Sequence, residues 1–341
     1  MKSCAQNLVL SVFVALLALG QITAASAQDV KVLKLSHQFP ASNGNEGDFR
    51  DQLANKFAKQ VEQKTGGSLK VEIYPGSSMM KPKSQFSALR KGILDMSVLP
   101  LAYGSGEVPE VGLTLMPALV QSYDQGLRWK TAPIGEALDK ILDAKGIKIV
   151  TWVWQAGGIV SRDKPIVNPD DTKGRKIRGG DKTIDLMLQG AGGSATNMAS
   201  SEIYSAMSSG VLDAAVTSST SLISYRLYEV AKSVTTARDK SFWFMFEPLL
   251  ISKTSWDTLT PEQQKIVMEV GASLEPFAVE GAKKDDQLLA DVYGKAGAKV
   301  SDMNQAAFDK WLAIAKETSY KDFADSSPDG KHLLDMALSV K

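Results

Sequence analysis

The sequence predicts an α/β protein built from two similar lobes. The segments "SALRKGILDMSV" (87–98) and "SAMSSGVLDAAV" (205–216) share Ser, Ala, Gly, Leu, Asp and Val at matching places. In each segment a helix ends at a glycine suited to a left-handed cap, and a strand-forming run follows at once. Strand and helix patterns precede both copies, so each half has the order β-α-β-α-β. That order is typical of a parallel sheet with helices on its faces.

The first half begins with a strand around residues 33–38 and continues with a helix in "EGDFRDQLANKFAKQVEQKTGG". Phe49, Leu53, Phe57 and Val61 recur every four residues, which is the spacing of one buried helix face. Two glycines end this helix. The following "LKVEIYP" (69–75) alternates apolar and polar residues, which predicts a second strand.

The second half contains strand "RKIR" (175–178), helix "KTIDLMLQGAG" (182–192), strand "SATNM" (194–198) and helix "SEIYSAM" (201–207). Residues 147–166 predict a long strand pair that carries the chain from the first lobe to the second, and 241–252 predict the return. Thr260, Pro261 and Gln263 predict an N-cap, a first-turn proline and a capping box. A long helical region should follow to about Ala296, with a break near Gly271 or Pro276.

These elements predict the division of the chain. Residues 1–27 are a signal peptide, 28–150 with about 243–275 form the first lobe, and 151–242 with about 276–341 form the second. The signal peptide is predicted from Lys2, the apolar run "LVLSVFVALLALG" and the small residues "ASA" at 25–27. We therefore expect export into the periplasm.

Composition excludes several classes of function. The only cysteine, Cys4, lies in the signal peptide, so the mature chain can form no disulfide and no thiolate site. Without Lys2 the 39 basic residues fall to 38, equal to the 38 acidic residues. This balance argues against nucleic-acid binding.

No motif predicts catalysis, a metal or a cofactor. The sequence has neither a GxSxG elbow nor an HExxH pair, and its two histidines, His37 and His332, lie near opposite ends. Arg178 is different, because it ends a predicted strand where ligands bind in parallel sheets. An arginine there can hold a carboxylate through two hydrogen bonds, and Gly179 and Gly180 leave room for a group to approach the backbone. The alternative is a solvated arginine at a strand end.

The segment "PDDTKGRKIR" (169–178) resembles the P-x-D-L-K-G-x-K-[IV]-R signature of the DctP-like solute-binding proteins of tripartite ATP-independent periplasmic (TRAP) transporters. "LKLSHQFP", "GSLKVEIYP", "LRKGILDMSVL", "SSEIYSAMSSGVLDA", "YRLYEVAK" and "LLISKTSWDTLTPEQQ" extend the resemblance over most of the mature chain. It implies a fold like the type II periplasmic binding proteins, with two lobes that close on an organic acid. It also implies that Arg178 binds the ligand carboxylate. Because no nucleophile–base pair is present, we expect a binding protein and not an enzyme. We expect a monomer that delivers its ligand to the small and large membrane subunits of a TRAP transporter.

Departures from the family pattern bear on the ligand. Many members have a second arginine where this chain has Gly158, a bulky aromatic where it has Ser200, and an asparagine where it has Thr217. The other predicted ligand-binding residues are Gln38, Ser218, Trp154 and Trp243. A single arginine favours a monocarboxylate over a C4-dicarboxylate, because a second buried carboxylate would lack a partner. Arg162 or Lys81 is left as an alternative source of a second charge. A periplasmic sensor for a receptor, or a secreted hydrolase, remains the alternative function.

Overall fold

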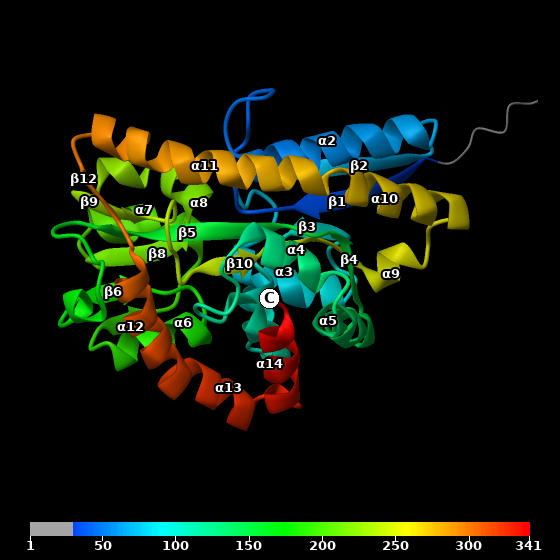
Figure 1. The fold of residues 1–341 in the computed structure, drawn as a ribbon. Helices are drawn as coiled ribbons and strands as arrows, with labels where there is room; N and C mark the ends of the chain where they lie inside the picture. Colours follow the sequence, from blue (N-terminus) through cyan, green and yellow to red (C-terminus); the bar gives the residue numbers. More distant parts are fainter. Residues whose placement is uncertain (1–29) are drawn as a thin grey trace, which may run out of the picture.

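The structure is a computed structural model and describes residues 30–341, so the predicted signal peptide lies outside the described residues. Two β-sheets lie side by side and are covered by helices (Figure 1). The first sheet has the strand order β2 (Leu69–Tyr74), β1 (Lys31–Ser36), β3 (Met96–Val98), β11 (Leu249–Ser252) and β4 (Ile147–Thr151). The predicted return segment does rejoin this sheet, because β11 lies between β3 and β4 and runs antiparallel to both.

The second sheet has the order β12 (Lys299–Asp302), β9 (Ser233–Thr236), β5 (Trp154–Ser161), β8 (Ala214–Ser218), β6 (Lys176–Arg178) and β7 (Ser194–Thr196), and β10 (Phe244–Phe246) pairs with β5. The strands β6, β7 and β8 are parallel, as the repeat predicted. The long strand β5 runs antiparallel to β8, β9 and β10, and all eight of its residues are buried. The crossing strand is therefore an interior element of the second sheet.

Helices cover both sheets. The α-helices are α2 (Phe49–Lys64), α3 (Pro82–Arg90), α4 (Tyr123–Trp129), α5 (Pro133–Ala144), α6 (Lys182–Gly190), α7 (Ile203–Ser208), α8 (Ser219–Ser224), α9 (Lys253–Trp256), α10 (Pro261–Ser273), α11 (Glu275–Lys295), α12 (Gln305–Ala315), α13 (Lys321–Ser326) and α14 (Gly330–Ser339). Short 3-10 segments are η1 (Leu101–Gly104), η2 (Pro109–Leu115), η3 (Pro169–Thr172), η4 (Ser200–Glu202) and η5 (Leu227–Glu229), and η6 (Lys316–Tyr320) is a π-helical turn.

The long helical region is confirmed, and it ties the lobes together. Thr260 caps α10 with the expected capping box, and the break falls at Leu274, between the two predicted positions. The next helix, α11, contacts α2 beside the first sheet and α8 and β5 beside the second. It runs along the top of Figure 1, from the first lobe across to the second. One helix thus spans both lobes.

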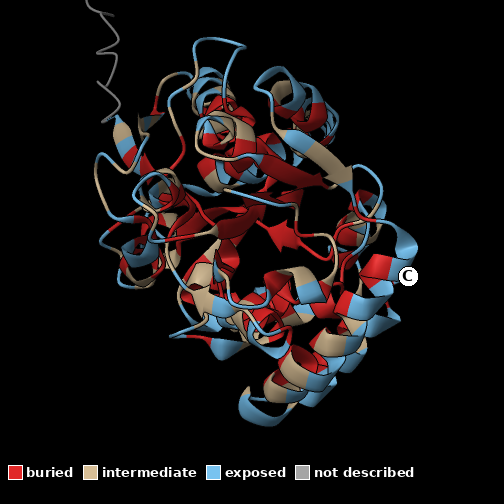
Figure 2. Ribbon diagram, turned by 90° about the vertical axis from the view of Figure 1, so that its left-hand side faces the viewer, coloured by how far each residue is buried: buried red, intermediate tan, exposed pale blue. Residues whose placement is uncertain are grey.

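The core is continuous between the lobes. The largest cluster of buried apolar side chains includes Leu35 in the first sheet, Phe246 at the hinge and Ile177 in the second sheet. In Figure 2 the central strands, such as β5, β8 and β11, are buried, while exposed residues lie on the outer faces of the helices. The last helix, α14, packs on α5, so the end of the chain lies against a helix from its first half. The boundaries of the two lobes stay a prediction.

Candidate ligand-binding site

Arg178 lies at the end of β6 with a side chain that is almost fully buried, with 2 % exposed. Its Nε donates to the carbonyl of Met198 at 3.1 Å, and Nη1 donates to the carbonyl of Val216 at 2.8 Å. Nη2 donates to the hydroxyl of Tyr103 at 3.1 Å. These bonds use three of the five guanidinium N–H groups, so one N–H remains on each terminal nitrogen. The arginine is fixed by the protein and still has donors for a ligand.

The two glycines after Arg178 have a structural role. A β-carbon on Gly180 would lie 2.7 Å from Cζ of Arg178, and the positive φ of Gly180, +103°, also disfavours other residues. A β-carbon on Gly179 would lie 2.2 Å from a carboxylate oxygen of Asp185 in α6. The glycines therefore make room for the guanidinium and for α6. Gly180 also lines a pocket beside Arg178, and the idea that the glycines admit a ligand to the backbone stays a prediction.

Two tyrosines connect Arg178 with two other predicted site residues. The hydroxyl of Tyr103 also accepts a hydrogen bond from the backbone N–H of Ser200 at 3.0 Å. The side chain of Ser200 lies within hydrogen-bonding reach of Tyr225, whose hydroxyl donates to the carbonyl of Gln38 at 3.1 Å. Burial raises the pKa of Tyr225 well above its ordinary value. Arg178, Ser200 and Gln38 are thus brought together where the two lobes meet.

The side chain of Gln38 is 3 % exposed, and neither its Nε2 nor its Oε1 has a hydrogen-bond partner among the described residues. A buried amide without partners is costly, because it loses its hydrogen bonds to water. This side chain therefore offers one acceptor and two donor hydrogens to a polar group between the lobes.

Thr217 in β8 follows Val216, whose carbonyl accepts a hydrogen bond from Arg178, and Trp243 directly precedes β10. Both are buried, and they flank Gly157, where a β-carbon would lie 2.3 Å from the carbonyl oxygen of Thr217 and 2.4 Å from the indole of Trp243. The absence of a side chain at Gly157 lets the indole lie against β5. The indole Nε1 of Trp243 has no hydrogen-bond partner among the described residues.

Ser218 has a structural role. Its hydroxyl caps α8 by accepting from the backbone N–H of Ser221 at 3.1 Å, and it also lies 3.4 Å from Nη1 of Arg50. The hydroxyl of Ser218 thus stabilises the start of α8 and contacts the buried Arg50. Its assignment as a ligand contact stays a prediction.

Gly158 and Trp154 are both buried residues of β5. A β-carbon on Gly158 would lie 2.4 Å from the backbone oxygen of Thr235 in β9, so the position faces the sheet interior and has no space for a side chain. Trp154 packs against Trp129 and Phe246, with ring centroids 5.2 and 5.0 Å apart. Gly158 pairs with Thr217 of β8, and Trp154 belongs to an aromatic cluster; the assignment of both residues to the ligand site stays a prediction.

The sequence interpretation missed a buried charge network. Arg50, at the start of α2, is fully buried and pairs with Asp48 at 2.6 Å and with Glu247 at 3.1 Å. It also donates to the hydroxyl of Ser221 in α8 at 3.2 Å. The network joins the first lobe to the hinge strands and to the second lobe. In the sequence, "GDFRD" is indistinguishable from a solvated helix start.

Burial raises the pKa of Glu247 to about 7, although Arg50 opposes the shift. Burial alone would lower the pKa of Arg50, but the charges of Asp48 and Glu247 outweigh it and raise that pKa. Two carboxylates share one cation here, and Asp48 makes the shorter contact. Gln155 donates a further hydrogen bond to Glu247.

A lysine that the sequence did not single out lies near the site. Nζ of Lys83, in α3, bonds the side-chain oxygen of Asn197 across the lobes and lies 5.5 Å from the ring centroid of Tyr103. A pocket of about 400 Å³ opens here, with Lys83, Tyr103, Gly180 and Asn197 in its walls. Of the proposed sources of a second charge, Arg162 packs beside Gly210 instead.

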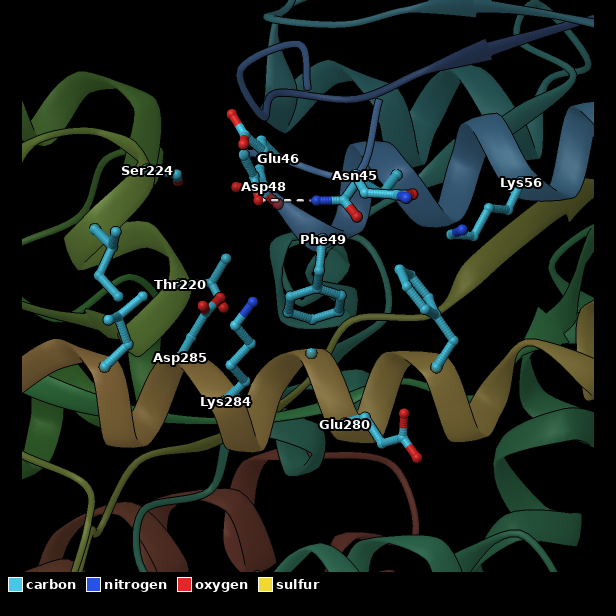
Figure 3. Close-up of a pocket in the computed structure, with 16 residues that line it drawn as sticks. Asn45, Glu46, Asp48, Phe49, Lys56, Thr220, Ser224, Glu280, Lys284 and Asp285 are labelled. Carbon is cyan, nitrogen blue, oxygen red and sulfur yellow. Dashed lines mark hydrogen bonds between the residues drawn. The ribbon is translucent and has the colours of Figure 1, made fainter. Parts of the chain in front are cut away.

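A larger pocket, of about 630 Å³, lies between the start of α2, α8 and α11 (Figure 3). Phe49 lies in its middle, with Lys284 and Asp285 of α11 and Thr220 of α8 nearby. None of the predicted ligand-binding residues lines this pocket. Within residues 30–341, no helix is long and apolar enough to span a membrane, and no group of three or more metal-ligating side chains was found.

Comparisons with known proteins identify the family. The model of the bacterial extracellular solute-binding protein family 7 (DctP) matches residues 41–326. The chain belongs to this family. A solute-binding protein of Albidiferax ferrireducens is 52% identical over 305 residues, which cover 89% of this chain and 90% of that protein.

Solved structures support the same assignment. The crystal structure of a TRAP periplasmic solute-binding protein from Rhodoferax ferrireducens, with bound malonate, matches with a TM-score of 0.89 and 52% identity. The match covers 90% of this chain and 98% of that one. A TRAP protein from Sulfitobacter with bound β-D-galacturonate has a TM-score of 0.81 at 24% identity over 90% of this chain and 99% of that one, which shows a shared fold. The family consists of solute-binding transport proteins, not enzymes, and TRAP solute-binding proteins are periplasmic. The predicted two-lobe fold is confirmed.

Proposed function

We propose that this chain captures an organic acid between its lobes, with the ligand carboxylate on Arg178, and delivers it to TRAP membrane subunits. The observation that carries the proposal is the buried guanidinium at the meeting of the lobes, which keeps two N–H groups beyond its three bonds to the protein. Shielded charge-assisted hydrogen bonds of this kind bind carboxylates strongly. Gln38 provides further donors and an acceptor for the body of the ligand.

We further propose that the preferred ligand carries one carboxylate. The position of the family's second arginine is Gly158, and the carbonyl of Thr235 leaves no room for a side chain there. A second carboxylate at that place would be buried without a cation, which is costly.

A short dicarboxylate is the second candidate. The Rhodoferax ferrireducens relative holds malonate, which has two carboxylates, and Lys83 brings a second cation to the rim of the site. Lys83 reaches this place from the first lobe, while Arg178 belongs to the second.

Isothermal titration calorimetry with malonate, succinate, lactate and benzoate tests both statements. We expect Arg178→Lys to bind at least tenfold more weakly, because one lost charge-assisted bond of about 1.5–3 kcal/mol corresponds to a factor of roughly 10 to 150. Arg238→Lys, which alters an arginine paired with Asp302, is the matched control and should bind like the wild type. Equal binding by Arg178→Lys contradicts the site. Malonate or succinate binding more tightly than both monoacids contradicts the single-carboxylate preference.

Delivery, compartment and oligomeric state need separate tests. We propose a monomer in the periplasm whose membrane partners are the small and large subunits of a TRAP transporter. Uptake into vesicles that contain both subunits should require this protein, and a receptor-linked sensor would support no uptake. Size-exclusion chromatography with light scattering should give the mass of one chain.

A further inference from the structure

Two donors of the second lobe converge on one oxygen of the first lobe. Nη2 of Arg178 lies 3.1 Å from the hydroxyl oxygen of Tyr103, and the backbone N–H of Ser200 lies 3.0 Å from the same atom. Tyr103 belongs to η1, just after the first-sheet strand β3, whereas Arg178 ends β6 of the second sheet. The tyrosine therefore bridges the lobes at the group that we assign to the ligand.

This pair of donors suits an anionic oxygen. A guanidinium N–H together with a backbone N–H is a donor set that binds carboxylate oxygens, and a charged acceptor makes the stronger bonds. A phenol is a neutral acceptor and gives weaker bonds at the same position. The hydroxyl of Tyr103 thus occupies a place where a carboxylate oxygen would bind better.

The surroundings let the ring move away. Tyr103 is only partly buried, and it forms part of the wall of the pocket of about 400 Å³ that also contains Gly180 and Asn197. On this side the ring is held by the ammonium group of Lys83, 5.5 Å from its centroid. A flexible lysine and an adjoining pocket leave space for a displaced ring.

We infer that the hydroxyl of Tyr103 is an internal substitute for one carboxylate oxygen of the ligand. This inference rests on the proposed function. The tyrosine accepts hydrogen bonds from Arg178 and from the backbone of Ser200, and it bridges the lobes. An acid that binds this pair of donors must displace the hydroxyl. Its apparent affinity then equals the affinity of a site without the hydroxyl, multiplied by the fraction of molecules in which the hydroxyl is unbound.

The test is Tyr103→Phe, titrated by calorimetry with malonate, succinate, lactate and benzoate. If the hydroxyl of Tyr103 is bonded to Arg178 and Ser200 in about nine molecules in ten, removing it should increase the affinity for the acid about tenfold. Tyr320→Phe is the matched control, because it removes another hydrogen-bonded tyrosine hydroxyl, one that donates to the carbonyl of Pro117, and should leave affinity unchanged. Circular dichroism of each variant verifies the fold.

A second readout follows the tyrosine itself. Displacement should change the near-ultraviolet absorption of a tyrosine when wild type binds its acid, and Tyr103→Phe should lack this difference signal. Weaker or unchanged binding by Tyr103→Phe overturns the inference, because the hydroxyl would then be a ligand contact or a bystander. Arg178→Lys separates this failure from that of the proposed function. If Arg178→Lys loses binding and Tyr103→Phe does not bind more tightly, only the role of the Tyr103 hydroxyl as a substitute is refuted. If Arg178→Lys binds like the wild type, the assignment of Arg178 to the ligand site is refuted.

Discussion

Replacing Arg50 by methionine tests the buried network between the lobes. Methionine keeps a long apolar side chain at the start of α2 but removes the cation that contacts both Asp48 and Glu247. All three side chains are at most 1 % exposed, so water cannot replace the lost partner without a structural change.

The expected loss follows from this geometry. Removing one partner of a buried ion pair costs about 3–5 kcal/mol, because the remaining charge is left buried. At about 2 °C per kcal/mol for a chain of this size, the melting temperature should fall by roughly 6–10 °C. Thermal unfolding followed by circular dichroism at pH 7 measures the change.

Two further variants sharpen this experiment. Adding Glu247→Gln to Arg50→Met removes one orphaned carboxylate and should recover part of the loss, which appears as a coupling energy in a double-mutant cycle. Arg238→Met is the control, because its partner Asp302 is partly exposed and such pairs contribute about 0–1 kcal/mol. A loss below about 1 kcal/mol for Arg50→Met would mean that the network is solvated, and the reasoning would be refuted.

Three other predictions concern binding, pH and packing. Arg178→Ala should abolish acid binding in calorimetry and also lower stability by about 1–3 kcal/mol, because three hydrogen bonds are lost; a stability equal to wild type would contradict the structural part. Burial raises the pKa of Glu247 to about 7 and that of Asp285 to about 6, so the folded state binds more protons than the unfolded state above about pH 4. The free energy of unfolding, measured in urea titrations, should therefore decrease as the pH is raised from 5 to 7.5. An increase over this range would contradict the sign of the effect. Gly158→Ala should lose about 1–3 kcal/mol, because its β-carbon would lie 2.4 Å from a carbonyl oxygen. By contrast, Gly294→Ala in the open side of α11 should gain up to about 1 kcal/mol, and equal melting temperatures for both would contradict the packing.

Local patterns were sufficient to predict most of the fold. Helix α2 follows the four-residue spacing of its apolar side chains, and α10 begins at the capping box of Thr260 and Gln263. Such signals depend on neighbours within a few residues, and the sequence displays these directly. The position of Arg178 at a strand end was predictable for the same reason, since it ends a short strand within a compact motif.

Residues whose role depends on distant partners were not predictable. Tyr103 and Arg178 are 75 positions apart, and Arg50 and Glu247 are 197 apart. Nothing near Tyr103 in the sequence indicates that its hydroxyl meets a strand end of the other lobe. The constraint at Gly158 is similar, because it arises from the neighbouring strand β9 and not from adjacent residues.

A crystal structure with the acid that binds most tightly in calorimetry tests the central proposal most directly. We predict one carboxylate of that acid within about 3 Å of Nη1 or Nη2 of Arg178, between the two lobes and within reach of Gln38. The contrary result is an acid bound elsewhere, for example in the pocket between α2, α8 and α11, while the guanidinium of Arg178 contacts only Met198, Val216 and Tyr103.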